Sequence, residues 1–426
     1  MKNPKLHITL LLVLTAFIFS ENANSQDWAK TLVKNQQRVD LRDLGYPDVN
    51  EVPVNSSAIT SLITASNGII YGGTSGDDAY LIMYEPTINK VRHLGKFPGH
   101  TAIHHSLVED KNGNIYIGTG KDMFEEVLLS KYGEGDDKLD VTLWKDIKKH
   151  FRDYAGGHLY CYKPSVSNNH VKLPDANAEA EDLGMPLANN SIYALTINPK
   201  AEEIYGITYP DGHFFIYNIP LKKFTDLGEI DAKKVYHGPE RVWRTLPRAL
   251  VCDDLGRVYM SSTNGMLKYY DPALGKLVST TIEIPGDYYF LQFYQDYTAV
   301  EYFAKDAKGL IYGGTTDGYL FYFDPQSMEL KNLGKVRESR RLRCLTVAKD
   351  GKVYMMAGER SATRPCQFYS YNPNGGGFEC YGLLLVDHSP YYYWRGQQFD
   401  CMTTGLDGTI FLGESERKSH LFLYIP

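Results

Sequence analysis

Short apolar runs bounded by turn residues recur along the whole chain. The clearest run is a strand that opens at a tight turn, as in NGIIYGGT at 67–74 and GLIYGGTT at 309–316. Such runs, with their β-branched and aromatic residues, predict β-strands and therefore an all-β protein. Seven copies occur, at 67–74, 112–119, 202–208, 256–263, 309–316, 351–358 and 408–415.

Each copy belongs to a larger repeat. An apolar strand precedes it, and a third strand follows and ends in aromatic-x-Pro or a near variant, such as Tyr270-Asp271-Pro272. Proline there ends a strand and sets the next turn. A fourth strand often carries Leu-Gly, as at Leu94-Gly95. Seven four-stranded units predict a seven-bladed β-propeller, because a β-helix or solenoid would need shorter repeats and capping units.

The two ends of the chain complete each other. The seventh unit stops at its third strand, because the chain ends at Pro426, and a segment with the missing Leu-Gly pattern lies at 38–47. We therefore expect the last blade to be closed by an N-terminal strand, which removes an exposed sheet edge.

One insertion interrupts the repeat, at about 122–157 in blade 2. Its second half places Leu143, Ile147 and Phe151 at helical spacing. We expect a small helix packed over the rim of the propeller; a lid over a binding site is the functional alternative.

The first 25 residues have the layout of a secretory signal peptide. Lys2 and Lys5 precede an apolar run at 8–19, and small residues allow cleavage near Ser25-Gln26. A short retained anchor is the alternative, although the run is too short for a comfortable membrane span. We expect residues 26–426 to form one secreted or periplasmic propeller without a membrane span. We also expect the protein to be a monomer.

The composition limits the classes of binding partner that we expect. The formal net charge is −6 and no basic stripe occurs, so nucleic acid is not an expected partner. Six cysteines show no zinc-binding spacing. Cys366 and Cys380 flank one predicted hairpin turn and are candidates for a disulfide, and the other four are expected to be buried thiols.

Aligning the first strands of the blades gives one equivalent position per blade, on the face where propellers usually bind ligands. Six of the seven side chains there are titratable. An imidazole, a phenol and two guanidinium groups that converge on one channel mouth suit a site that polarises an acid and moves a proton. A charged ring that simply pairs with itself is the alternative. The positions, named here the channel ring, are Thr60, His105, Tyr193, Arg248, Glu301, Arg343 and Asp400.

Loops on the same face add aromatic and basic groups. His158 begins the third strand of blade 2 and is expected beside His105. Tyr, Trp and Arg in loops suit stacking on sugar rings and binding of carboxylates, whereas packing of loop against loop is the alternative. The loop candidates are Tyr209, Trp243, Arg244, Tyr392 and Trp394.

This constellation resembles the seven-bladed polysaccharide lyases, which include ulvan lyases and L-rhamnose-α-1,4-D-glucuronate lyases. The resemblance implies β-elimination at a uronic acid, with His105 and Tyr193 carrying protons, His158 assisting and Arg248 neutralising the carboxylate. Substrate contacts would come from the five loop residues above and from Glu301, Arg343 and Asp400. Those families tend to have arginine where this chain has Tyr209, and the blade 2 insertion is extra; both departures concern the substrate more than the reaction.

Two other functions stay open at this point. A glycoside hydrolase, for instance a rhamnosidase, would use two carboxylates, for which Glu301 and Asp400 are the ring candidates. A non-catalytic glycan-binding propeller is the second. The expected partner is an acidic polysaccharide or oligosaccharide. No cofactor or catalytic metal is required if arginine supplies the charge, and the sequence leaves room for a structural metal ion.

Overall fold

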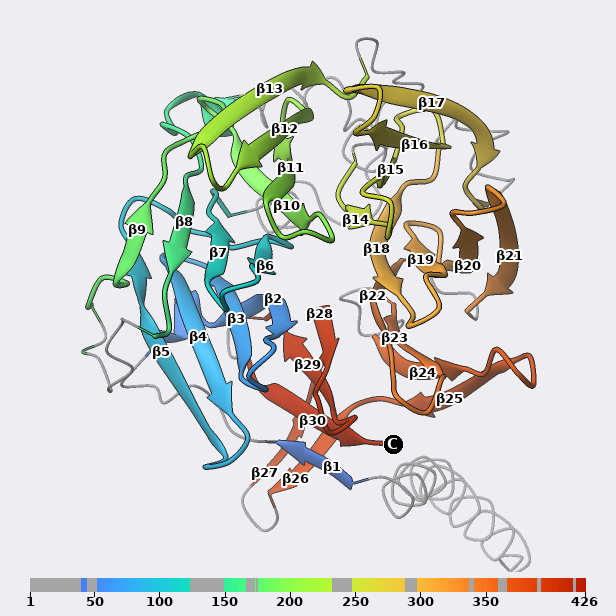
Figure 1. Cartoon of the computed structure of the whole chain (residues 1–426). Helices are drawn as coiled ribbons and strands as arrows, with labels where there is room; N and C mark the ends of the chain where they lie inside the picture. Colours follow the sequence, from blue (N-terminus) through green and yellow to red (C-terminus); the bar gives the residue numbers. More distant parts are fainter. Residues whose placement is uncertain are drawn as a thin grey trace, which may run out of the picture.

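The computed structural model describes residues 40–43, 52–122, 149–165, 173, 175–231, 247–287, 297–336, 341–358, 366–388, 392–416 and 419–426. Within them the chain forms seven four-stranded antiparallel sheets around a common centre (Figure 1). The protein is therefore an all-β, seven-bladed β-propeller, as the repeats predict. The predicted signal peptide lies outside the described residues. No helix in the described part of the chain is long and apolar enough to cross a membrane.

The strands follow the chain blade by blade, from the channel outward. Blade 1 comprises β2 (Ala58–Thr64), β3 (Ile70–Ser75), β4 (Ala79–Glu85) and β5 (Lys90–Phe97); blade 2, β6 (Leu107–Glu109), β7 (Ile115–Gly118), β8 (Leu159–Tyr162) and β9 (Ala180–Asp182). Blade 3 comprises β10 (Ser191–Ile197), β11 (Glu203–Tyr209), β12 (His213–Asn218) and β13 (Lys223–Glu229); blade 4, β14 (Val251–Cys252), β15 (Val258–Ser261), β16 (Met266–Asp271) and β17 (Lys276–Glu283). Blade 5 comprises β18 (Val300–Lys305), β19 (Ile311–Thr315), β20 (Tyr319–Asp324) and β21 (Glu329–Lys335); blade 6, β22 (Leu342–Val347), β23 (Val353–Ala357), β24 (Gln367–Tyr371) and β25 (Phe378–Gly382).

Blade 7 joins the two ends of the chain. It contains β28 (Phe399–Thr404), β29 (Ile410–Glu414), β30 (Leu421–Ile425) and the N-terminal β1 (Asp40–Asp43). The antiparallel register places Asp40 opposite Ile425 and Asp43 opposite Phe422. This confirms the predicted closure, in which the backbone groups of β30 are paired and no longer form an open edge. A 3-10 turn (Val54–Ser56) leads into blade 1, and β26 (Leu385–His388) and β27 (Tyr392–Arg395) form a separate hairpin.

Apolar contact between neighbouring blades forms the core. The middle strand β3 is buried along its whole length, because blades pack against both of its faces. In the first interface Tyr71 and Leu81 of blade 1 pack against Ile115 and Tyr162 of blade 2. Each fully buried large apolar side chain contributes about 1.5–3 kcal/mol. The outermost strand β17 alternates exposed and partly buried residues, which is typical of a sheet edge that faces water.

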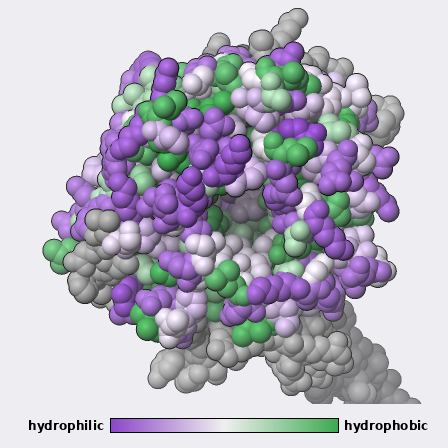
Figure 2. Space-filling model, viewed as in Figure 1, coloured by the Kyte–Doolittle hydropathy of each residue, from purple (hydrophilic) through white to green (hydrophobic). Residues whose placement is uncertain are grey.

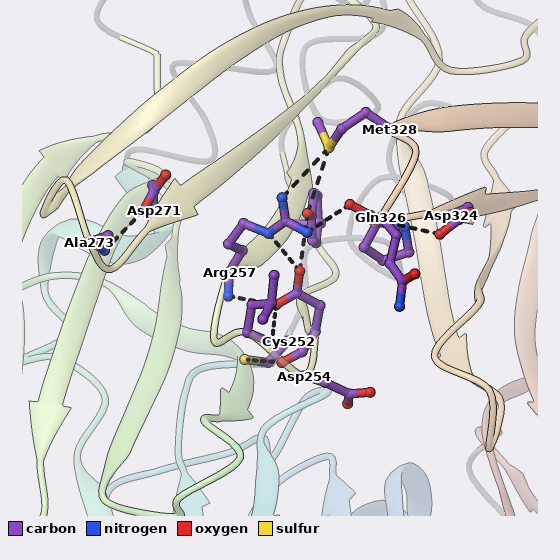
Figure 3. Close-up of polar contacts among 12 residues, drawn as sticks. Cys252, Asp254, Arg257, Asp271, Ala273, Asp324, Gln326 and Met328 are labelled. Atoms are coloured by element: carbon purple, nitrogen blue, oxygen red, sulfur yellow. Dashed lines mark hydrogen bonds and ion pairs between the residues drawn. The ribbon is translucent and has the colours of Figure 1, made fainter.

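A partly buried arginine, Arg257, joins blades 4 and 5 (Figure 3). Arg257 donates to the carboxylate of Asp253 at 2.7 Å within its own turn, and to the carbonyl of Pro325 at 2.7 Å in the neighbouring blade. The same Asp253 accepts the backbone N–H groups of Leu255 and Arg257, so it also fixes the hairpin turn. Equivalent turns recur around the ring, for example at Asp110. They account for the tight turn that precedes each sequence repeat.

Only the end of the blade 2 insertion is described. A helical turn covers residues 149–152, as the spacing predicts, whereas Leu143 and Ile147 lie outside the described residues. Phe151 is 1% exposed and packs in a cluster that includes Tyr193, Tyr205 and Tyr209 of blade 3. The helical turn is therefore anchored on the propeller beside the channel ring.

The possible disulfide between Cys366 and Cys380 does not form. All six cysteines are free thiols. Cys366 is buried just before β24, and burial raises the pKa of its thiol to about 11. Cys380 is exposed in β25, opposite Tyr369. The strand register thus offsets the two thiols along the sheet. Two cysteines that flank the same turn are therefore not opposite each other here.

Candidate functional site

β-bulges place the channel ring. In five blades the register of the first strand shifts across a single residue, which is left out of the ladder. A bulge bends the strand and re-aims one side chain, and here it does so at the same level in each blade. The shared bulge explains why residues aligned by sequence are also equivalent in space. The residues that the pairing skips are Thr60, Tyr193, Glu301, Arg343 and Asp400.

The other two ring residues precede shorter first strands. His105 lies before β6, and its carbonyl accepts the N–H of Leu195 from blade 3 at 3.0 Å. Arg248 lies before β14 and is 4% exposed. Figure 2 shows a hollow at the centre of the ring of blades, on the face in view.

Most charges in the ring pair with one another. Arg248 donates to both carboxylate oxygens of Glu301, at 3.1 and 3.0 Å. Arg343 donates to Asp400 at 2.6 Å, and Gln398 and Ser415 bond the second oxygen of that carboxylate. The alternative of a self-pairing ring is thus realised for these four charged residues.

Sequence alignment missed one member of this network. Arg341 precedes β22 and donates to Glu301 at 2.8 and 3.3 Å. Its φ of 65° is left-handed, a costly backbone conformation for arginine that persists where the surroundings fix it. Arg343 occupies the position that the alignment of first strands compares, whereas Arg341 lies two residues earlier and was not considered. The run Arg340-Arg341-Leu342-Arg343 is the sequence signal that could have identified it.

These arginines keep both ring carboxylates ionised. Burial alone would raise the pKa of Glu301, but Arg248 and Arg341 hold it at about 2. For Asp400, burial again acts to raise the pKa, and Arg343 overcomes it, so that the pKa lies below its ordinary value. At neutral pH neither group can donate a proton.

His105 is the channel-facing histidine. Its ring lies edge-to-face against Tyr193 at 5.8 Å and against Tyr302 at 5.3 Å, between ring centroids. Its Nδ1 is buried and has no hydrogen-bond partner among the described residues. It also borders a cavity of about 160 Å³ along the channel, lined mainly by apolar residues of blades 1 to 5. Tyr302 reaches across from blade 5, and its hydroxyl donates to the carbonyl of Met402 at 3.4 Å.

Burial makes His105 a neutral imidazole at physiological pH. Burial is the largest influence and lowers its pKa, Asp400 and Glu301 oppose this effect, and Arg248 and Arg341 add to it. A neutral imidazole with an unpaired ring nitrogen is able to accept a proton.

A second histidine, which the sequence reasoning passed over, supports Tyr193. His104 is buried, and its ring lies 4.7 Å from that of Tyr193. Its Nε2 contacts the carbonyl of Lys121 at 3.0 Å, which requires the proton on Nε2. Burial lowers the pKa of His104 to about 4. The signal in the sequence was the doublet His104-His105, of which only the second residue matched the aligned position.

His158, which was predicted beside His105, makes its described contacts with other residues. Its Nδ1 contacts Asp182 at 2.9 Å, and its ring lies 5.4 Å from that of His100 and stacks on Tyr160. No described contact joins it to His105. The sheet order explains the difference, because β7 lies between β6 and β8 and neighbouring strands are about 4.8 Å apart.

The remaining loop candidates divide into two groups. Tyr209 ends β11 and is 4% exposed; its ring lies 5.9 Å from that of Tyr193 and 5.6 Å from that of Phe151. It therefore backs the ring rather than presenting a wide surface. Trp243 and Arg244 lie outside the described residues, as do the side chains of Tyr392 and Trp394, whose backbone forms β27. Within the described chain no three His, Cys, Asp or Glu residues are arranged to hold a metal ion.

Fold and ring together define a seven-bladed β-propeller with a buried network of charges and aromatic rings at its channel. A family profile described as two component regulator propeller matches residues 98–121. No curated protein sequence matches the chain.

Several solved structures share the fold. A streptogramin B lyase aligns over 91% of this chain and 97% of its own, with 9% identity and a TM-score of 0.59. The extracellular domain of a putative hybrid two-component system from B. thetaiotaomicron aligns over 91% of this chain and 41% of that one, with 14% identity and a TM-score of 0.54. A fungal alcohol oxidase in complex with copper aligns over 88% of this chain and 75% of its own, with 13% identity and a TM-score of 0.55. At these identities the similarities show the propeller fold alone.

Proposed function

We propose that this protein is an exported polysaccharide lyase that cleaves a uronate-containing glycan by β-elimination. The observation that carries the proposal is the contact between His105 and Tyr193 at the channel, 5.8 Å between ring centroids. One group is a neutral imidazole and the other a phenol, and together they can move two protons.

The reaction needs these two transfers. A base removes the proton α to the uronate carboxylate, the electron pair left behind forms a carbon–carbon double bond, and the bond to the glycosidic oxygen breaks. The departing oxygen then takes a proton. Either of His105 and Tyr193 can fill either role; burial, which lowers the pKa of His105, keeps its imidazole in the neutral form that a base requires.

Arginines supply the charge that the intermediate requires. Loss of the α proton leaves a second negative charge next to the carboxylate, and fixed guanidinium groups stabilise such charge by about 3–4 kcal/mol. Three guanidinium groups meet two carboxylates in the ring, through Arg248, Arg341 and Arg343. Because Glu301 and Asp400 hold these groups in place, the guanidinium positions are set before substrate arrives.

A glycoside hydrolase is the weaker candidate. Hydrolysis with two carboxylates needs one that is protonated and can act as an acid. Arginines keep the pKa of both Glu301 and Asp400 depressed, so neither suits that role.

A non-catalytic glycan-binding propeller is the second candidate, and a specific observation favours it. The ring charges are paired with one another, and extracellular domains of two-component systems share the fold. Under this hypothesis the protein would bind an oligosaccharide without turning it over.

The test is to incubate the purified protein with rhamnose–glucuronate polymers and to follow ultraviolet absorbance of an unsaturated product. We expect absorbance to rise, and His105→Ala to lower the rate at least about 100-fold. Leu221→Ala, on the exposed surface, is the matched control and should keep the wild-type rate. Tight binding with no absorbance change would instead establish the binding propeller, and an unchanged rate in His105→Ala would refute the assigned site.

A further inference from the structure

A second and larger cavity lies outside the channel ring, at the seam between blades 4 and 5. Its volume is about 430 Å³. Its walls are the turn between β15 and β16, the end of β17 with residues 284–287 that follow it, residues 297–298 before β18, Asp317 between β19 and β20, and part of β21. Arg248 and Glu301 join the same two blades at the ring, so the cavity and the ring share one seam.

Two side-chain amides offer donors to this cavity. The Oδ1 of Asn264 accepts the N–H of Met266 at 3.2 Å, and the Oδ1 of Asn332 accepts the N–H of Gly334 at 2.9 Å. The Nδ2 group of each amide has no hydrogen-bond partner in the described part of the chain and can donate to a ligand. The carboxylate of Glu283 adds an exposed acceptor on the same wall.

An apolar floor lies beside these polar groups. Ile284, which is 5% exposed, Pro285 and Leu330 contribute to it. Tyr297 lies against Gly265, where an added Cβ would come within 3.1 Å of the tyrosine ring. The glycine thus lets the aromatic ring approach the turn closely. An aromatic and aliphatic surface bordered by a few polar groups is typical of small-molecule sites and suits the apolar face of a sugar ring.

The charge of the cavity decides which sugar fits. Three carboxylates line it, those of Glu283, Asp287 and Asp317, and no lysine or arginine is among the described residues of the lining. Lys335 pairs with Asp287 at 3.1 Å from outside the lining. A uronate would be repelled here, whereas an uncharged sugar would exchange hydrogen bonds with the amides and carboxylates.

We infer that the cavity between blades 4 and 5 binds a neutral glycosyl unit, while the arginines of the ring take the acidic unit of the same glycan. This inference deepens the proposed function and rests on it for the identity of the ligand.

The experiment measures binding without turnover. The protein carries ¹³C-labelled methyl groups on methionine and isoleucine, and L-rhamnose, D-xylose, D-galactose and D-glucuronate are titrated separately. We expect at least one neutral sugar to shift the methyl signals of Met266 and Ile284 saturably, with no shift at Ile115 in the core of blade 2. D-glucuronate should leave these signals unchanged.

The variant Asn264→Ala/Asn332→Ala should weaken this binding roughly tenfold, which is what two lost hydrogen bonds remove. Gly265→Ala should also weaken it, because its φ of 78° strains an alanine in the turn and the added Cβ meets the ring of Tyr297. Unchanged core methyl signals verify that each variant is folded. Absence of a shift with all three neutral sugars, an equal response to D-glucuronate, or wild-type binding by the double variant would overturn the inference. Saturable binding in a protein that yields no unsaturated product would uphold the cavity and remove the lyase proposal.

Discussion

Arg248 and Glu301 form a buried ion pair at 3.0 Å between blades 4 and 5, with each side chain 4% exposed. The resemblance assigned Arg248 to a substrate carboxylate, yet in the structure it already holds a carboxylate of the protein. Glu301 is shared with Arg341, so the pair belongs to a network that fixes two guanidinium groups together.

Removal of Arg248 should destabilise the protein strongly. Arg248→Ala leaves Glu301 buried with one guanidinium fewer, and breaking a buried pair costs about 3–5 kcal/mol. We expect a lower midpoint in urea unfolding. Lys111→Ala, which breaks the exposed pair with Glu202, is the control and should leave the midpoint nearly unchanged. Equal midpoints for the two variants would show that the ring pair contributes little to stability.

Stability should fall at acid pH because of Glu301. Its folded-state pKa of about 2 lies below the ordinary value of 4.5, so the unfolded state binds more protons between these values. The contribution is fully present above the ordinary pKa and is lost as the pH falls toward 2, by about 3 kcal/mol in total. Unfolding free energies measured across this window should have a smaller slope in Glu301→Gln. A variant with the wild-type slope would contradict the assignment.

The pH dependence of turnover should identify the base. If His105 accepts the proton, kcat/KM rises with pH through the lowered pKa of His105 and is level near neutrality. Arg341→Met removes a positive charge that lowers this pKa, so the acid limb should move to higher pH. Arg152→Met, at an exposed position, should leave the limb in place. A kcat/KM that is low at neutral pH and keeps rising with pH up to an alkaline pKa would assign the base to Tyr193.

The anchored helical turn should support the ring. Phe151→Ala removes a ring that is 1% exposed and contacts Tyr209, and such truncations cost about 3–5 kcal/mol. We expect a lower melting temperature together with a lower kcat, because Tyr209 in turn contacts Tyr193. Phe151→Leu should recover most of both, and Leu173→Ala, 74% exposed, should alter neither. A loss of stability with unchanged kcat would limit Phe151 to a structural role.

The sequence by itself determined the fold and its closure. Turn residues and strand-ending prolines are local signals repeated seven times, and the last unit alone lacks its fourth strand. The register of the repeats also located Tyr193, Glu301 and Asp400 at equivalent points. The bulge that skips these residues was not visible in the sequence, but it lies at the same place in five blades and preserved the alignment.

Only the tertiary structure decided which side chains meet. Arg341 joins Glu301 through a left-handed backbone conformation that no strand pattern encodes, and His104 reaches Tyr193 although it is one residue out of register. His158 pairs with Asp182, because contacts on a sheet depend on strand order rather than on shared chemistry. Repetition along the chain specifies positions in the ring, whereas pairing of charges and rings depends on distances between blades, which arise when the chain closes on itself.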